Sequence, residues 1–508
     1  MPGRTVLLAA LCLLASPLLF ASEPLLALPP LLVSPLPRAQ PCESLTKLST
    51  AKVVVDAAKP VVEGALPQPN GGAKLSALPA FCRVAVTLKP TADSDIHAEI
   101  WLPTAGWNGK LMAVGSGGWG GSINYSSMAE ALRRGYATAA TDDGHVGDSA
   151  SFVVGHPEKF VDFAYRAEHE MTVVAKAVVD AFYGRAARYS YWNGCSGGGR
   201  EGLLQAYRYP EEFDGIIAGD PADMRRNAWA LWLATKTFKD AVDYIPPAKY
   251  AMIHRFVLDA CDANDGVKDG LIEDPSSCKV DFAKLACKGG DAADCLTQRQ
   301  VKTAQTIISP FRDSKGEQLF PRLEPGTEMR WARVAGGPDP AELFWDQFRY
   351  VVYQNAQWDW RSFDLDRDPA KANAVNRDVD ALDPHLEAFA KRGGKLLLYH
   401  GWADQQVAPG STVEFYKALH DVNGDWVRLF MAPGMAHCSG GEGPDSFDKI
   451  GVMEDWVERG KVPARIVASH HAAGKVDRTR PLCAYPQVAK YKGSGSVDDA
   501  GSFVCAVK

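Results

Sequence analysis

Ser196 stands in a glycine-flanked pattern that is typical of a serine nucleophile. The G-C-S-G-G pattern at 194–198 follows a strand-favouring apolar run, 189–192, and precedes a helix-like segment through 203–206. In this context a G-x-S-x-G motif exposes the serine hydroxyl above a sheet edge, at a helix N-terminus that favours developing negative charge. The alternative for so short a motif is an ordinary serine in a glycine-rich turn.

An acid and a histidine follow two later predicted strands. Asp404 comes shortly after the apolar run 395–399, and His437 lies on a loop after the run 426–430. These are the positions expected for the acid and the base of a serine triad, and the order serine, acid, histidine is that of the α/β-hydrolase fold. His400, directly after the first run, is predicted to support the site rather than to act as the base.

The cysteines connect two of these residues. There are eleven, and loss of Cys12 with an N-terminal signal leaves ten, an even number that suits an oxidised exported protein. Spacing and elimination predict five disulfides: Cys42–Cys82, Cys195–Cys438, Cys261–Cys278, Cys287–Cys295 and Cys483–Cys505. Because Cys195 precedes Ser196 and Cys438 follows His437, their bridge would hold the two side chains at hydrogen-bonding range. The chain-entropy estimate for so long a loop is about 5 kcal/mol of stabilisation, as an upper bound.

A glycine-rich loop at 115–121 follows the apolar run 110–114. Its spacing matches neither a P-loop nor a dinucleotide-binding fingerprint. At this place in an α/β-hydrolase, such a loop supplies a backbone N–H to the oxyanion hole. We therefore expect Gly197 and either Gly117 or Gly118 to donate to an oxyanion, with a plain flexible loop as the alternative.

The order of the predicted elements indicates the fold class. Alternating strand-like and helix-like segments imply a mostly parallel sheet covered on both faces. From about 224 to 382 this alternation gives way to loop-rich sequence with many tryptophans and four cysteines. We predict an α/β-hydrolase core in two parts, 40–223 and 383–508, with a large inserted lid domain at 224–382 that forms one wall of the substrate site.

The N-terminus predicts export. Arg4 precedes an apolar run at 6–20 of signal-peptide length, and apolar, proline-rich sequence continues to 37. Residues 1–39 are interpreted as a signal peptide and leader, with cleavage between about 22 and 40. The mature protein is expected to be periplasmic or extracellular, without a stable membrane anchor. The net charge of −6 argues against a nucleic-acid partner, and the oligomeric state is not specified.

An acidic loop inside the insertion has the composition of a calcium site. Asp262, Asp265 and Asp269 would offer carboxylates, and Val267 and Leu271 would offer backbone carbonyls. The spacing does not fit an EF-hand. The alternative is a solvated acidic turn held by the predicted 261–278 disulfide. No nucleophile or histidine lies alongside, so a bound ion would have a structural role.

These motifs resemble those of the tannase and feruloyl esterase family, which includes mono(2-hydroxyethyl) terephthalate hydrolases. The resemblance rests on 194–200, 400–404, 434–438 and the acidic loop 262–271, and it spans nearly the whole mature chain. It implies an α/β-hydrolase core with an inserted lid, calcium bound in the lid, and hydrolysis of esters of aromatic acids. Terephthalate-ester hydrolases carry a phenylalanine three positions after the triad aspartate, where this chain has Val407.

We therefore predict an exported serine carboxylic-ester hydrolase of feruloyl esterase or tannase type. It would act on small esters of hydroxycinnamic or gallic acid through a Ser-His-Asp triad and an acyl-enzyme, without an organic cofactor. The first alternative is a terephthalate-type aromatic ester hydrolase. A serine peptidase of the same fold would need a subsite for a peptide terminus, and none is evident. A non-catalytic binding protein would be expected to lack a triad member, and none is missing.

Overall fold

The described part of the chain is built on a large central sheet. The computed structural model describes residues 40–422 and 424–507, so the predicted signal and leader at 1–39 lie outside the described residues. Nine strands form this sheet in the order β1-β4-β5-β7-β6-β8-β9-β12-β13. Their bounds are β1 Val53–Val61, β4 Phe81–Leu88, β5 Ile96–Pro103, β7 Ala137–Thr141, β6 Lys110–Val114, β8 Tyr189–Cys195, β9 Gly215–Gly219, β12 Lys395–Gly401 and β13 Val427–Ala432.

The sheet is mostly parallel, as predicted. The strands from β7 through β13 pair in parallel, whereas β1, β4 and β5 join at the other edge as antiparallel strands. In β9 every residue is buried, which explains why the parallel strands are continuous apolar runs in the sequence. Edge strand β1 is largely exposed or half-buried and has a weaker apolar pattern.

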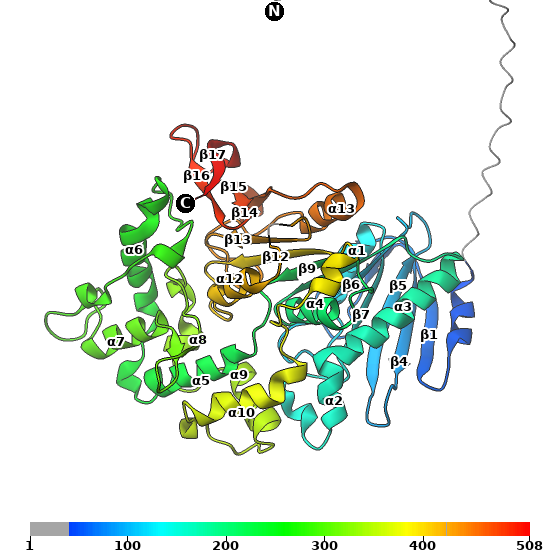
Figure 1. The fold of residues 1–508 in the computed structure, drawn as a ribbon, viewed down its shortest axis with the longest axis horizontal. Helices are drawn as coiled ribbons and strands as arrows, with labels where there is room; N and C mark the ends of the chain where they lie inside the picture. Colours follow the sequence, from blue (N-terminus) through cyan, green and yellow to red (C-terminus); the bar gives the residue numbers. More distant parts are fainter. Residues whose placement is uncertain (1–39, 423, 508) are drawn as a thin grey trace, which may run out of the picture. The chain divides into compact units, whose positions relative to one another are not determined.

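Helices cover both faces of the sheet. One face carries α3 (Ala167–Tyr183), α4 (Gly197–Arg208) and α12 (Pro409–Ala418), and the other carries α1 (Tyr125–Arg133) and α13 (Lys449–Arg459) (Figure 1). Successive side chains of a strand point to opposite faces. In β12, Leu396 and Leu398 accordingly belong to the hydrophobic core on the α3, α4 and α12 side of the sheet, and Leu397 and Tyr399 belong to the core on the α1 and α13 side. This architecture confirms the predicted α/β-hydrolase class.

A separate hydrophobic core lies within the predicted insertion at 224–382. Its members run from Ala228 to Ala372, with Ala408 added from the sheet domain. Trp229, Trp331 and Trp360 are fully buried there, so these tryptophans serve packing. The helices of this region are α5 Arg225–Thr237, α6 Tyr250–Cys261, α7 Gln298–Ile307, α8 Ala332–Ala335, α9 Glu342–Asp346 and α10 Arg367–Val375. Figure 1 shows α5, α6 and α7 as a helical group beside the sheet, away from β1 and β4.

The remaining α-helices are short, and the remaining strands form two-stranded hairpins. They are α2 Pro157–Val161, α11 Glu387–Lys391, β2 Gly64–Leu66, β3 Leu75–Leu78, β10 Phe311–Arg312, β11 Gln318–Phe320, β14 Arg465–Ala472, β15 Lys475–Cys483, β16 Gln487–Tyr491 and β17 Phe503–Val507. Within residues 40–422 and 424–507, no helix combines the length and hydropathy needed to cross a lipid bilayer.

All five predicted disulfides are present, which confirms the pairing inferred from the sequence. The Cys195–Cys438 bridge spans 243 residues of chain, with its Cα atoms 5.9 Å apart. It connects the end of β8 to the loop after β13.

Candidate active site

Ser196 occupies a strained turn between β8 and α4. Its backbone has φ 60° and ψ −118°, a conformation that is uncommon for residues other than glycine. The turn is held by hydrogen bonds from Ser196 N–H to the Gly219 carbonyl, at 2.9 Å, and from Ala222 N–H to the Ser196 carbonyl, at 3.0 Å. A Cβ atom at Gly194 would lie only 2.2 Å from the Gly198 oxygen, so a side chain at this position would clash with the turn. The motif therefore has the local geometry predicted for it.

The glycine-rich loop after β6 packs directly against this turn. A Cβ atom on Gly197 would lie 3.1 Å from Gly117 Cα and 3.3 Å from Gly118 N. Gly198 N–H donates to the Ser116 carbonyl at 2.8 Å, which fixes the loop to the start of α4. The three glycines predicted to form an oxyanion hole are thus close neighbours.

Asp404 and His437 form a short hydrogen-bonded pair. His437 Nδ1 lies 2.6 Å from Asp404 Oδ2, and Asp404 Oδ1 accepts the N–H groups of Gln406 and Val407 at 2.6 and 2.9 Å. Burial alone would raise the pKa of Asp404, but the charge of His437 and the hydrogen bonds from His400 and His437 outweigh it. They hold this pKa well below its ordinary value. The carboxylate is therefore ionised and fixes the orientation of the His437 ring.

His400 lies behind Asp404. Its Nε2 is 3.2 Å from Asp404 Oδ2, and its Nδ1 is 2.8 Å from Thr412 Oγ1. The side chain is fully buried, and the cavity that contains Ser196 does not include it. The ring therefore packs behind the acid and contacts its carboxylate.

Asp220 is a further buried acid at this site, and we did not predict it from the sequence. It follows β9, has a positive φ of 39°, and its Oδ1 accepts the Gly401 N–H at 3.0 Å. The same oxygen lies 3.6 Å from His400 Nε2. Burial raises the pKa of Asp220 to about 6, against the opposing charge of His400. A carboxylate at the carboxyl end of a parallel strand is the signal that could have identified it.

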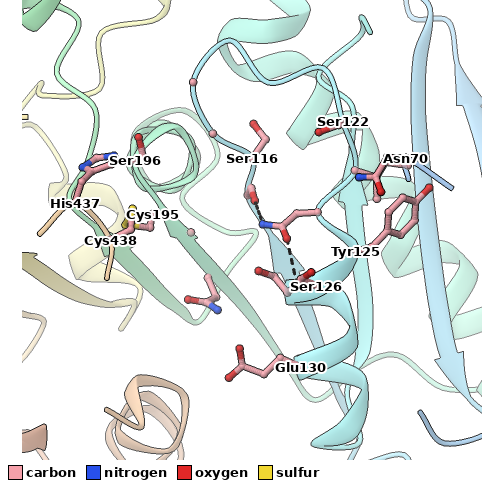
Figure 2. Close-up of a pocket in the computed structure, with 18 of the residues that line it drawn as sticks. Asn70, Ser116, Ser122, Tyr125, Ser126, Glu130, Cys195, Ser196, His437 and Cys438 are labelled. Carbon is pink, nitrogen blue, oxygen red and sulfur yellow. Dashed lines mark hydrogen bonds between the residues drawn. A yellow bond between two sulfur atoms is a disulfide. The ribbon is translucent and has the colours of Figure 1, made fainter. Parts of the chain in front are cut away.

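Ser196 and His437 line the same cavity, which has a volume of about 620 Å³. Figure 2 shows the two side chains close together above the Cys195–Cys438 bridge. Gly117 and Gly118 also line it, and Leu343 of α9 contributes from the insertion. Polar side chains line much of the remaining surface: Gln68, Asn70, Ser122, Asn124, Glu130, Asn193 and Lys449.

In the acidic loop at 262–271, aspartate carboxylates accept hydrogen bonds from backbone amides of the same loop. Asp262 accepts the N–H groups of Asp269 and Gly270 at 3.1 and 3.0 Å, and Asp265 Oδ1 accepts that of Val267 at 3.1 Å. Asp265 Oδ2 is buried and has no hydrogen-bond partner among the described residues. An orphaned oxygen in an all-oxygen donor set fits a hard cation. Arg480 contacts Asp269 Oδ2 and already neutralises part of the loop.

Comparison with known proteins identifies the family. The sequence model of tannase and feruloyl esterase matches residues 82–506. The chain belongs to the tannase and feruloyl esterase family. An uncharacterised esterase of Xanthomonas campestris is 38% identical, over 91% of this chain and 91% of that protein. A probable feruloyl esterase B-2 of Neosartorya fischeri is 34% identical, over 84% of this chain and 86% of that protein.

Solved structures of this family have the same fold. Feruloyl esterase B from Aspergillus oryzae aligns with a TM-score of 0.87 at 31% identity, over 92% of this chain and 99% of that one. Tannin acyl hydrolase from Aspergillus niger aligns with a TM-score of 0.77 at 22% identity, over 92% and 95% of the two chains, and shows the shared fold. As a member of this family, the chain is a carboxylic ester hydrolase.

Proposed function

We propose that this family member is an exported serine esterase that hydrolyses esters of hydroxycinnamic or gallic acid through Ser196, His437 and Asp404. The main support is the Cys195–Cys438 bridge, which joins the residues next to Ser196 and His437 while Asp404 holds the His437 ring at 2.6 Å. The names of the relatives and structural neighbours favour an aromatic acyl group.

The proposed reaction begins with proton transfer from Ser196 Oγ to His437 Nε2 as the hydroxyl attacks the ester carbonyl. Asp404 stabilises the imidazolium that forms. The N–H groups of Gly197 and of Gly117 or Gly118 would bind the oxyanion, and one such donor contributes about 3 kcal/mol to transition-state stabilisation. His437 then returns the proton to the departing alcohol. Water repeats the sequence on the acyl-enzyme and releases the acid.

Val407 bears on the terephthalate alternative. Its side chain is fully buried and its N–H donates to Asp404. Valine has no aromatic ring, so this position lacks the ring that packs on the substrate in terephthalate-ester hydrolases. This difference favours the hydroxycinnamic or gallic class.

We propose also that the acidic loop holds Ca²⁺ through Asp262, Asp265, Asp269 and the carbonyls of Val267 and Leu271. When bound, the ion would supply charge neutralisation and order the loop, and no catalytic step uses it. Export is supported by the five disulfides, because such bridges persist in oxidising compartments.

Turnover of an ester panel by the wild type and by Ser196→Ala tests this function. The panel comprises methyl ferulate, methyl gallate, chlorogenate, a mono(2-hydroxyethyl) terephthalate ester and a matched feruloyl amide. We expect the wild type to prefer the hydroxycinnamic or gallic esters, and Ser196→Ala to lose about 10⁴-fold or more in kcat. Retained turnover in Ser196→Ala would refute the nucleophile, and faster hydrolysis of the amide would indicate a peptidase.

A further inference from the structure

Three buried carboxyl groups meet beneath the glycine-rich loop. Asp143 follows β7, Glu168 lies on α3, and Glu201 lies on α4. Each offers an oxygen within 4.8 Å of the others, and each residue is at most 1% exposed. The proposed reaction uses none of these groups.

The cluster holds Ser116, the second residue of the loop, through three contacts. Ser116 N–H donates to Glu201 Oε2 at 3.0 Å, and Ser116 Oγ lies 2.7 Å from Glu201 Oε1 and 2.5 Å from Asp143 Oδ2. A serine hydroxyl has one hydrogen and can donate to only one of two carboxylates. A second short oxygen–oxygen contact therefore needs a proton on one of the two carboxyl groups.

The surrounding charges indicate which group carries that proton. Arg200 faces Glu201, with Nη2 at 3.7 Å from Oε1, so Glu201 has a countercharge as well as the Ser116 N–H. Asp143 Oδ1 and both carboxyl oxygens of Glu168 accept no hydrogen bond from an N–H or hydroxyl group in the described part of the chain, and the Asp143 and Glu168 carboxyl groups lie within hydrogen-bonding range of each other. An uncompensated buried carboxylate is strongly disfavoured.

The directions in which the pKa values of Asp143 and Glu168 are shifted agree with this assignment. Burial, together with the neighbouring charge of Glu201, raises the pKa of both Asp143 and Glu168 well above their ordinary values. In this assignment the neutral Asp143 would donate its proton to Ser116 Oγ, and the Ser116 hydroxyl would donate to Glu201.

We propose that Asp143, as a neutral acid, and Glu201, as a carboxylate, are positioning residues that hold the oxyanion loop through Ser116. The inference rests on the proposed function, which gives the loop its purpose. Ser116 links the cluster to the reaction centre, since its carbonyl accepts the Gly198 N–H of the nucleophile turn at 2.8 Å. Gly117 and Gly118 follow directly, so a shift of Ser116 moves the oxyanion donors. Apolar side chains in place of these three acids would stabilise the fold at least as well. The presence of the acids therefore favours a functional role for the cluster.

Two substitutions of Asp143 separate proton donation from mere packing. In Asp143→Asn the amide N–H replaces the acid proton, and asparagine tolerates the positive φ of 58° at this position. We expect Asp143→Asn to keep kcat within about threefold. Asp143→Ala should lower kcat about tenfold to a hundredfold with little change in KM, because small misplacements of catalytic groups have effects of this size. The kcat of the wild type should fall at alkaline pH as Asp143 loses its proton, whereas Asp143→Asn should lack that fall.

Two control variants, Asp368→Ala and Glu201→Gln, distinguish a loss of loop positioning from a loss of stability. Asp368→Ala removes a buried, hydrogen-bonded carboxyl group of the insertion and should lower Tm without lowering kcat. Glu201→Gln conserves volume and serves where Asp143→Ala does not fold; it should also lower kcat.

If turnover depends on Ser196 but Asp143→Ala and Glu201→Gln match the wild type, the positioning role is overturned and the proposed function stands. Equal losses in Asp143→Asn and Asp143→Ala would overturn the neutral-acid role. Turnover that survives in Ser196→Ala would overturn the proposed function itself.

Discussion

The residues around Ser196 hold its backbone in a strained conformation. The positive φ of Ser196 is maintained by backbone hydrogen bonds to Gly219 and Ala222, and small neighbours leave room for them. A Cβ atom at Gly199 would lie 2.4 Å from the Gly219 oxygen, so the start of α4 also requires glycine. A strained backbone conformation of this kind persists when several surrounding contacts fix it together, as the hydrogen bonds and close packing around Ser196 do.

Asp220 should make stability depend on pH. Its pKa of about 6 in the folded protein exceeds the ordinary value of 3.8, so its favourable contribution is complete below about 3.8 and is lost as the pH rises through about 6. Asp220→Asn cannot ionise, and its stability relative to the wild type should therefore increase between pH 4 and pH 7. The two pKa values differ by about 2, which corresponds to about 3 kcal/mol.

Urea unfolding of both proteins at pH 4, 5, 6 and 7 measures this difference. A difference in unfolding free energy that stays constant across these pH values would contradict a buried, titrating Asp220.

At the level of secondary-structure elements, the loops that carry Ser196 and His437 are joined by a disulfide bond. The Cys195–Cys438 bridge brings the end of β8 to the loop after β13, across the intervening strands β9 and β12. A bridge over 243 residues also removes much entropy from the unfolded chain. Its position beside Ser196 and His437 suggests a second effect, on geometry.

Removing this bridge should reduce activity more than stability alone explains. In the double variant C195A/C438A, we expect kcat to fall about tenfold to a hundredfold at temperatures where the protein stays folded, because Ser196 and His437 lose their fixed separation. The matched control is C287A/C295A, which opens a bridge of only 8 residues' separation in the insertion and should keep its kcat. Circular dichroism would verify folding of both. Equal kcat values for the two double variants would contradict the tethering role.

The elements that sequence patterns predicted well are those with a strong local cause. Buried parallel strands such as β9 are apolar throughout, and the turn at Ser196 needs glycines at fixed offsets. The disulfides and the Asp404–His437 contact could be predicted because strand ends and cysteines mark these positions. Edge strand β1 and the hairpins β14 to β17 were not predicted, since half-exposed strands have weak patterns. Asp220 and Asp143 gain their significance only when distant strand ends converge in the fold.

At the scale of the whole molecule, the acidic loop connects the insertion to the C-terminal hairpins. Arg478 Nη2 of β15 donates to the Asp269 carbonyl at 2.8 Å, and Arg480 contacts the Asp269 carboxylate. Just beyond the loop, Glu273 Oε1 accepts the Ala489 N–H of β16 at 2.7 Å. Order in this loop therefore affects two parts of the chain that are far apart in sequence.

Chelation should reveal the proposed calcium ion. If the loop binds Ca²⁺, EDTA should lower Tm by roughly 5 °C, because loss of a ligand held at a hundred times its Kd costs about 2.7 kcal/mol. The variant Asp265→Asn weakens the donor set and should show a smaller response to EDTA. Differential scanning calorimetry gives the shift, and elemental analysis of the purified protein gives the metal content. An unchanged Tm together with no bound calcium would contradict the site and leave the acidic turn as a hydrogen-bonded loop.

The proposed function requires Ser196 to carry the acyl group during ester hydrolysis. Its most direct test is acid quenching of the wild type during turnover of a feruloyl ester, followed by peptide mapping by mass spectrometry. We predict a feruloyl adduct on the peptide that contains Ser196, and no adduct in Ser196→Ala. An adduct on another residue, or its formation in Ser196→Ala, would contradict the account.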